Sequence, residues 1–220
     1  MRIKICGIRT PEDGLAAAQL GADAIGVLVG QAHPSPDFIN AAAARRILER
    51  LPPLVSGVLV SHVNDPALLS ALIQEVRPAA VQIHSPMAVD DVAQVRRNHP
   101  GLTLLKAVHI HNEPPLAFVH RYAAVVDGVV ADSCNPDSGQ VGGTGLTHDW
   151  QHSAALVKQS SVPLLLAGGL NADNVAAAIA QVQPWGVDVN SGVKTADGRQ
   201  CRERMAQFIT AVRAAANSIA

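Results

Sequence analysis

Aromatic side chains, cysteines and an excess of charge of either sign are all scarce in this chain. Its 220 residues include three Phe, two Trp and one Tyr, and the formal net charge is −1. A chain this close to neutral has no basic field with which to attract nucleic acid. Three widely separated cysteines, Cys6, Cys134 and Cys201, are odd in number and argue against a disulfide framework.

Long apolar runs are missing as well. No stretch approaches the roughly 18 apolar residues that a membrane-spanning helix needs. A strand-like run follows Met1 and Arg2 directly and Pro11 soon interrupts it, so no signal peptide is expected. These absences predict a soluble, cytoplasmic, globular protein with neither a membrane nor a nucleic acid as partner.

Aliphatic residues are abundant instead, and short β-rich runs alternate with Ala-rich helical stretches. The expected strands are Ile3–Gly7, Ala24–Val29, Val55–Ser61, Ala80–His84, Thr103–Ile110, Val125–Asp132, Pro163–Gly168 and Gly186–Asn190. The clearest helices are Glu12–Leu20, Ala41–Leu51, Pro66–Arg77, Val89–Arg97, Asp173–Gln181 and about Cys201–Ile219. Eight strand–helix repeats predict an α/β fold of the (β/α)₈ TIM-barrel type, with a doubly wound open sheet as the alternative. No linker divides the chain, so residues 1–220 are expected to form a single domain.

Alternation along the strands predicts which side chains face the barrel interior. Ile3 and Ile5 suit the helix layer, so Lys4 and Cys6 would point inward. The other side chains expected to point inward near the C-terminal strand ends are Gln82, His84, Asp188 and Asn190, with Asp132 at the very end of the sixth strand. A lone strand Cys is usually a small core residue, but polar groups converging on this end of a barrel indicate a site.

Two glycine-bearing turns follow the last two expected strands. Gly168 and Gly169 precede a helix that opens near Asn171, and Ser191 and Gly192 follow the eighth strand. Glycines allow close backbone approach, and a helix N-terminus offers N–H donors to an anion. Phosphate is often bound by the loops after strands seven and eight of a barrel, so these five residues are predicted to bind phosphate.

Seven motifs occur in order along the chain: KICGI, GADAIGVLV, GVLV (57–60), VQIH (81–84), GGTGLTHDW (142–150), LAGGLNADNV (166–175) and GVDVNSGV (186–193). Together they resemble the phosphoribosylanthranilate isomerase family over nearly the full length. The resemblance implies an Amadori rearrangement of an N-substituted 5-phosphoribosylamine to a 1-amino-1-deoxyribulose 5-phosphate. It also implies no cofactor, no metal and a small sugar-phosphate substrate as partner; a monomer or a homodimer is expected.

The same resemblance assigns roles to individual residues. Cys6 would be the general base and Asp132 the general acid. The substrate would be contacted by Lys4, Arg9, Gln82, His84, Gly143, Gly145 and Asp188. A thiol must ionise to act as a base, and Lys4 on the same strand face is hypothesised to lower the pKa of Cys6.

The match departs from the family pattern in the loop after the second strand. The family carries an S-x-R-Y segment there, whose Arg holds the anthranilate carboxylate, whereas this chain has Asp37 and Phe38 in HPSPDFIN. The family's SGVE is SGVK here, ending in Lys194. Either another cation, for instance Arg9 or Lys106, takes over the carboxylate, or the chain is a divergent paralogue that applies the same chemistry to a different N-glycosyl phosphate.

A metal-dependent hydrolase and a sugar-phosphate binding protein without activity are the alternatives from other classes of function. His109-x-His111 resembles the H-x-H pair of metal-dependent barrel hydrolases, but those enzymes carry it on the first strand. A sugar-phosphate binding protein without activity is the other alternative, and it would have no need of both Cys6 and Asp132.

Overall fold

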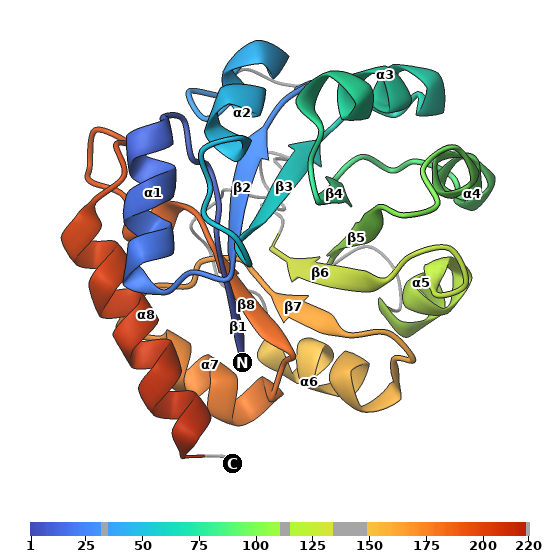
Figure 1. The fold of residues 1–220 in the computed structure, drawn as a ribbon. Helices are drawn as coiled ribbons and strands as arrows, with labels where there is room; N and C mark the ends of the chain where they lie inside the picture. Colours follow the sequence, from blue (N-terminus) through green and yellow to red (C-terminus); the bar gives the residue numbers. More distant parts are fainter. Residues whose placement is uncertain (32–34, 111–114, 134–148, 219–220) are drawn as a thin grey trace.

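The computed structural model describes residues 1–31, 35–110, 115–133 and 149–218, and within them eight parallel strands close into a barrel (Figure 1). The strands are β1 (Arg2–Ile5), β2 (Ala24–Leu28), β3 (Ser56–Ser61), β4 (Ala80–Ile83), β5 (Thr103–His109), β6 (Gly128–Asp132), β7 (Leu164–Leu166) and β8 (Gly186–Val189). Each strand pairs with the next in sequence, and β8 pairs with β1. The predicted (β/α)₈ barrel is therefore confirmed, and the open sheet is excluded.

Helices surround the barrel on the outside (Figure 1). They are α1 (Pro11–Leu20), α2 (Ala41–Leu48), α3 (Pro66–Val76), α4 (Val89–Asn98), α5 (Pro115–Tyr122), α6 (Trp150–Gln159), α7 (Val175–Val182) and α8 (Arg202–Asn217), with a short 3₁₀ helix η1 (Ser191–Val193) after β8. No helix among the residues described is long and apolar enough to cross a membrane.

Helix starts follow the capping residues of the sequence. Thr10 caps α1 by accepting the N–H of Asp13, and Asp65 caps α3 in the same way. Helix α7 begins later than expected, at Val175, because the side chain of Asn171 accepts the N–H groups of the next residues and forms a turn before the helix.

Strand β6 is shorter than the expected run from Val125. The N–H groups of Val125 and Val126 both bond to the carbonyl of Tyr122 and so belong to the turn after α5. Asp127 then accepts the N–H of Leu104 through its carboxylate, which fixes the entry into the strand. The apolar pattern could not separate these turn residues from the strand that follows them.

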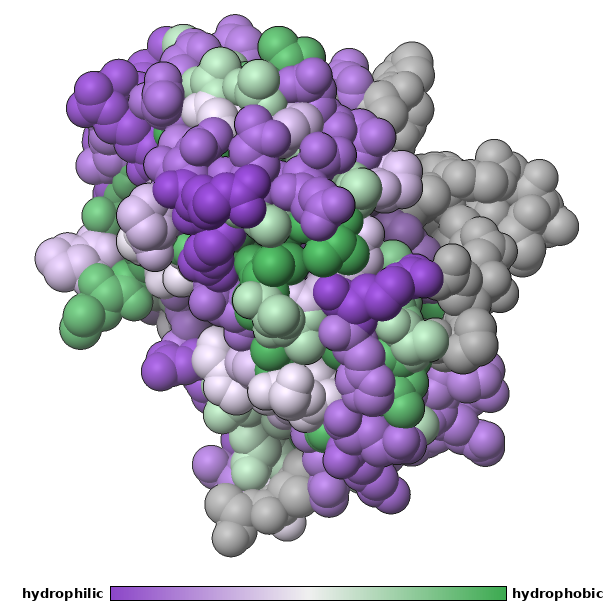
Figure 2. All heavy atoms as spheres, turned by 90° about the vertical axis from the view of Figure 1, so that its right-hand side faces the viewer, coloured by the Kyte–Doolittle hydropathy of each residue, from purple (hydrophilic) through white to green (hydrophobic). Residues whose placement is uncertain are grey.

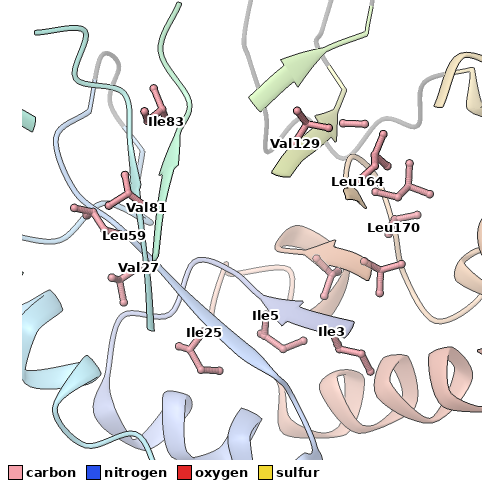
Figure 3. Packing of buried hydrophobic residues seen from close by; sticks show 14 of the residues in the cluster. Ile3, Ile5, Ile25, Val27, Leu59, Val81, Ile83, Val129, Leu164 and Leu170 are labelled. Atoms are coloured by element: carbon pink, nitrogen blue, oxygen red, sulfur yellow. The ribbon is translucent and has the colours of Figure 1, made fainter. Parts of the chain in front are cut away.

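Apolar side chains pack on both sides of the barrel wall. The larger group lies between barrel and helices and includes Val187 as well as Ile3, Ile5 and Val81. The side chains of Ile3, Ile5 and Val81 point away from the barrel axis, as the alternation predicts (Figure 3). The interior holds smaller clusters, one of which groups Cys6 with Leu28, Val58, Val60 and Ala80. Outside, the face that carries α4 and α5 is mostly hydrophilic (Figure 2). Because the strands are packed mainly by apolar side chains, the buried polar residues of the barrel interior indicate a site.

Candidate active site

A buried ion pair joins the first and last strands inside the barrel. Lys4 Nζ lies 2.6 Å from Asp188 Oδ2, with side chains 1% and 8% exposed. The two residues are register partners, since Lys4 faces Asp188 across the β1–β8 ladder. Burial alone would lower the pKa of Lys4, but the charges of Asp188 and Cys6 outweigh it and raise that pKa. Lys4 is therefore a fixed positive charge in the barrel interior.

Cys6 follows β1 directly and is buried beside this pair. Its thiol lies against the backbone of β2, where a Cβ on Gly26 would come within 2.8 Å of Sγ. Burial raises the pKa of Cys6 to about 11; Lys4 acts in the opposite direction, and Asp188 adds to the increase. The hypothesis that Lys4 lowers the pKa of Cys6 is correct for that single interaction, but the net direction is upward because the burial of the thiol outweighs it.

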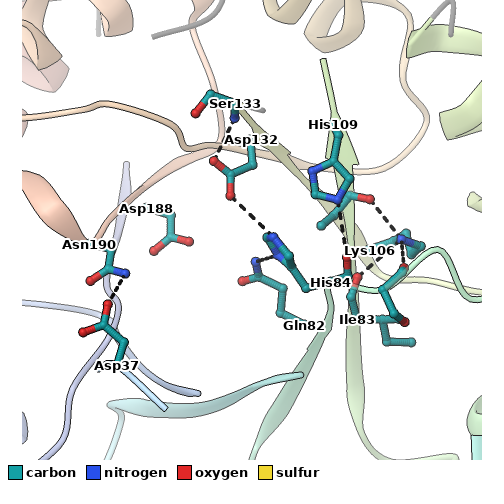
Figure 4. Close-up of polar contacts among 12 residues, drawn as sticks. Asp37, Gln82, Ile83, His84, Lys106, His109, Asp132, Ser133, Asp188 and Asn190 are labelled. Atoms are coloured by element: carbon teal, nitrogen blue, oxygen red, sulfur yellow. Dashed lines mark hydrogen bonds and ion pairs between the residues drawn. The ribbon is translucent and has the colours of Figure 1, made fainter. Parts of the chain in front are cut away.

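Asp132 ends β6 and is also buried. Burial, reinforced by the negative charge of Asp188, raises its pKa to about 7, although the N–H of Ser133 donates to its Oδ1 at 2.8 Å. His84 Nε2 lies 3.9 Å from Asp132 Oδ2, and His84 Nδ1 lies 3.3 Å from Gln82 Nε2 (Figure 4). A carboxyl group that is half protonated near neutral pH is suited to donating a proton.

Four rings form a row from Asp132 toward the loop after β2. His109 and His84 meet edge to face with centroids 4.9 Å apart, His84 stacks on His62 at 4.7 Å, and His62 meets Phe38 at 5.2 Å. The sequence interpretation missed His62, although Val58 and Val60 on β3 face inward and place residue 62 on the same side. These four aromatic rings line one side of the candidate site.

Buried acceptor oxygens without hydrogen-bond partners lie in the same region. Among the residues described, these include Gln82 Oε1, Asp188 Oδ1 and Asn190 Oδ1. Figure 4 shows the side chains of Asp132, His84 and Asp188 converging from different strands on one space. Buried acceptors are normally satisfied, so this set matches a ligand that carries several hydroxyl or N–H donors.

The turns after β7 and β8 lie against each other. Gly168 and Gly169 have positive φ angles, and a Cβ on Gly192 would come within 2.0 Å of the carbonyl oxygen of Leu170. Asn171 turns its side chain toward the backbone of its own turn, so its amide oxygen is already engaged. The two turns are thus adjacent, as a shared anion site would require, and Ser191 opens η1 beside them.

The loop after β2 is joined to the end of β8 by a second ion pair. Lys194 Nζ lies 2.5 Å from Asp37 Oδ1, and Asn190 Nδ2 donates to Asp37 Oδ2 at 2.9 Å. A Cβ on Gly7 would lie 2.8 Å from Lys194 Nζ, which places the ammonium next to the residue that follows Cys6. The two departures from the family pattern are therefore partners of each other.

The cations suggested as alternative carboxylate receptors are engaged elsewhere. Arg9 donates to the carbonyls of Pro36 and Gly198, which fastens the loop after β2 to the hairpin after η1. Lys106 faces the helix layer, over the rings of Phe118 and Tyr122, so the alternative in which it receives the carboxylate gains no support from its position. Its ammonium donates instead to the carbonyl of Ser85, just beyond β4, and to that of Ala107 within β5. Burial lowers the pKa of Lys106 to about 7.

Two expected substrate contacts, Gly143 and Gly145, lie outside the described residues, as does His111. Within the described ranges, no three His, Cys, Asp or Glu side chains group in a way that could hold a metal ion. The H-x-H interpretation thus gains no support from the part of the chain that the structure covers. The fold and its polar interior define a TIM-barrel enzyme whose candidate site lies at the C-terminal ends of the strands.

Comparison with known proteins narrows this class. Residues 3–211 match the family model of N-(5'phosphoribosyl)anthranilate (PRA) isomerase. A protein of Methanosarcina mazei named N-(5'-phosphoribosyl)anthranilate isomerase 2 is 39% identical over 209 residues, covering 95% of this chain and 92% of its own. The isomerase of Methanocella arvoryzae is 38% identical over 212 residues, covering 96% and 98%. The chain belongs to the PRA isomerase family and is an intramolecular isomerase.

Solved structures agree with this assignment. The phosphoribosyl anthranilate isomerase of Thermotoga maritima has a TM-score of 0.83 and 31% identity, covering 97% of this chain and 99% of that one. Another structure of the family, in complex with reduced 1-(o-carboxyphenylamino)-1-deoxyribulose 5-phosphate, has a TM-score of 0.81 and 29% identity with the same coverage.

Proposed function

We propose that this chain converts N-(5'-phosphoribosyl)anthranilate to 1-(o-carboxyphenylamino)-1-deoxyribulose 5-phosphate in tryptophan biosynthesis, with Cys6 as general base and Asp132 as general acid. One observation carries the assignment of roles. A thiol on β1 and a carboxyl group on β6 are both buried at the same end of the barrel, and the Lys4–Asp188 pair acts electrostatically on both. An acid–base pair on two non-adjacent strands is what a proton shift between two atoms of one substrate needs.

The chemistry follows from these two groups. Protonated Asp132 gives its proton to the ring oxygen of the ribose, and the C1–O bond breaks to leave a protonated Schiff base. The Cys6 thiolate then removes the proton from C2, and the C2 electrons neutralise the iminium nitrogen to give an enolamine. Ketonisation returns a proton to C1 and yields the ketose. Each proton transfer contributes about 10²–10⁴-fold when the group is well placed.

The surrounding residues have roles that fit this substrate. The unpartnered oxygens of Gln82 and Asp188 would accept from ribose hydroxyl groups or from the anilinic N–H, with His84 beside the acid. The adjoining turns at Gly168, Gly169 and Asn171 and at Ser191 and Gly192 would bind the phosphate through backbone N–H groups. Bound at the opposite end from the aryl group, the phosphate would fix the ribose between acid and base.

Turnover of phosphoribosylanthranilate by the purified chain tests the proposal. In D₂O, abstraction of the C2 proton by a base whose own proton exchanges with solvent introduces deuterium into substrate or product, which NMR detects. Cys6→Ser should abolish both turnover and exchange, whereas Cys201→Ser, at a partly exposed cysteine, should leave both unchanged. Rescue of a tryptophan auxotroph lacking this step checks the assignment in cells. Undiminished turnover by Cys6→Ser would contradict the assigned base.

A second candidate is the same rearrangement on another N-glycosyl phosphate. It is favoured by Asp37, a carboxylate where the family has an arginine. If the chain acts on a phosphoribosylamine with a neutral or cationic amine part and not on the anthranilate compound, this candidate replaces the first. Cys6 and Asp132 keep their roles in either case.

A further inference from the structure

The Asp37–Lys194 pair joins the loop after β2 to the segment after β8, at the end of the barrel where the candidate site lies. The side chains of Lys194 and Asp37 are 7% and 13% exposed, so both charges are largely withdrawn from water. A buried pair of this kind costs desolvation energy and is weak evidence for a role in stability. Its presence at the mouth of the site calls for another explanation.

Among the cations discussed, Lys194 is the one whose charge lies both at Asp37 and next to the residue that follows Cys6. Lys4 is held by Asp188 deep in the barrel, and Arg9 spans two loops through Pro36 and Gly198. An ammonium has three N–H donors, and the contact with Asp37 uses one of them. Lys194 also acts on the thiol, since its charge lowers the pKa of Cys6.

The aromatic row leads to the same point. It starts beside the acid, where His84 lies next to Asp132, and ends at Phe38, the residue after Asp37. A flat aryl group lying along this row would have its edge near the Asp37–Lys194 pair. Asn190 holds Asp37 in place, because its Nδ2 donates to the Asp37 carboxylate. Its Oδ1 is buried without a hydrogen-bond partner among the described residues and could accept from a ligand.

We propose that Lys194 is the specificity residue for the aryl part of the substrate. The ammonium binds an aryl carboxylate, which takes the place of Asp37 at Nζ, and Asp37 keeps the ammonium in position while the site is empty. This inference rests on the proposed function and specifies its substrate class as N-aryl phosphoribosylamines that carry a carboxylate. The substrate carboxylate then compensates the charge of Lys194, while Asp37 keeps the amide N–H of Asn190 as its hydrogen-bond donor.

Two substrates separate recognition of the carboxylate from everything else. Ribose 5-phosphate is condensed with anthranilate or with aniline, and kcat and KM are measured for each product. The native chain should favour the carboxylated substrate. Lys194→Met should lower kcat/KM for it by about 10–100-fold, mostly through KM, because one charge-assisted contact is lost. The same variant should leave KM for the aniline substrate unchanged, because the effect of Lys194 on the pKa of Cys6 acts on kcat and is common to both substrates. Lys194→Arg should keep the preference.

Asp37→Asn is the complementary variant. It removes the competing carboxylate, so KM for the carboxylated substrate should fall several-fold while KM for the aniline substrate stays the same. If Lys194→Met folds poorly because Asp37 is left buried and unpaired, the double variant Lys194→Met/Asp37→Asn replaces it, with circular dichroism as the check on folding. This double variant should also lose the preference.

The outcomes distinguish the two proposals. Equal losses on both substrates in Lys194→Met, or an unchanged preference, overturn the role of Lys194 while turnover by the native chain upholds the proposed function. If the native chain prefers the aniline substrate, the role of Lys194 is also overturned, and Asp37 is then the residue that determines specificity. If the native chain turns over neither substrate, the proposed function itself is wrong.

Discussion

Lys4 Nζ and Asp188 Oδ2 are 2.6 Å apart inside the barrel, and their charges act on the thiol of Cys6 and on the carboxyl group of Asp132. One ion pair thus sets the electrostatic environment of both groups proposed to transfer protons. Lys4 favours the ionised form of each, whereas Asp188 disfavours it. Separate replacement of the two partners should therefore change the pH dependence in opposite directions.

Removal of Lys4 alone should destabilise the fold strongly. Lys4→Met leaves the Asp188 carboxylate buried without its counter-ion, and breaking a buried pair from one side costs about 3–5 kcal/mol. Lys4→Met/Asp188→Asn should recover most of this loss because neither charge remains. Urea unfolding of the native chain, both single variants and the double variant measures the coupling. Additive effects would mean that the pair contributes no coupling.

The pH–rate profile should be broad. The proposed reaction needs protonated Asp132 and ionised Cys6, whose pKa values are about 7 and about 11. kcat/KM should rise with pH up to about 7, stay level, and fall above about 11, because the gain in thiolate offsets the loss of protonated carboxyl between these limits. Only about 10⁻⁴ of the enzyme carries this protonation state on the plateau.

The same profile tests the influence of Lys4 on the thiol. Lys4→Met should move the upper limit of the plateau to higher pH, and Asp188→Asn should move it to lower pH. An upper limit that stays in place in both variants would contradict the assignment of that limit to Cys6. Measurements of kcat/KM across this pH range, with folding checked at each pH, give the answer.

Asp132 should make the fold less stable as pH rises. Its pKa is raised from 3.8 to about 7 by folding, so the folded state binds more protons than the unfolded state between these values. The free energy of unfolding must then fall between about pH 4 and pH 7, by on the order of 4 kcal/mol at most. Asp132→Asn removes this dependence and should gain stability relative to the native chain as pH rises. Chemical unfolding at pH 5 and pH 8 measures the difference.

Gly26 should tolerate no side chain. A Cβ at this position would lie 2.8 Å from Cys6 Sγ and 3.2 Å from the Cα of Cys6. Gly26→Ala should lower kcat/KM by about 100-fold, in line with the effect of displacing a reacting group by about 1 Å. Gly101→Ala, at a glycine with open space around it, is the matched control and should leave activity unchanged.

The barrel could be predicted because its signals are local. Strands such as β1, β4 and β8 alternate apolar and polar residues, and a cap such as Thr10 acts within one turn of its own helix. The inward direction of Cys6, Gln82 and Asp188 follows from the same alternation. The boundaries of the strands were harder to predict, since Val125 is apolar whether it lies in a strand or in a turn.

The contacts that define the mouth of the site could not be predicted. Asp37 and Lys194 are 157 residues apart, and nothing in either segment indicates the other. Their separate departures from the family pattern were visible, but their pairing depends on how two loops meet. The net direction of the Cys6 pKa was missed for a similar reason, since burial is a property of the assembled barrel.

The closure of β1 against β8 delays assembly of the reactive centre during synthesis of the chain. Asp188 lies 184 residues after Lys4 in the sequence, and Gln200, which donates to the carbonyls of Cys6 and Gly7, comes later still. Contacts of such separation form slowly because a long loop must close first. The reactive centre of the nascent chain therefore stays incomplete until β8 and the residues that follow it have been synthesised.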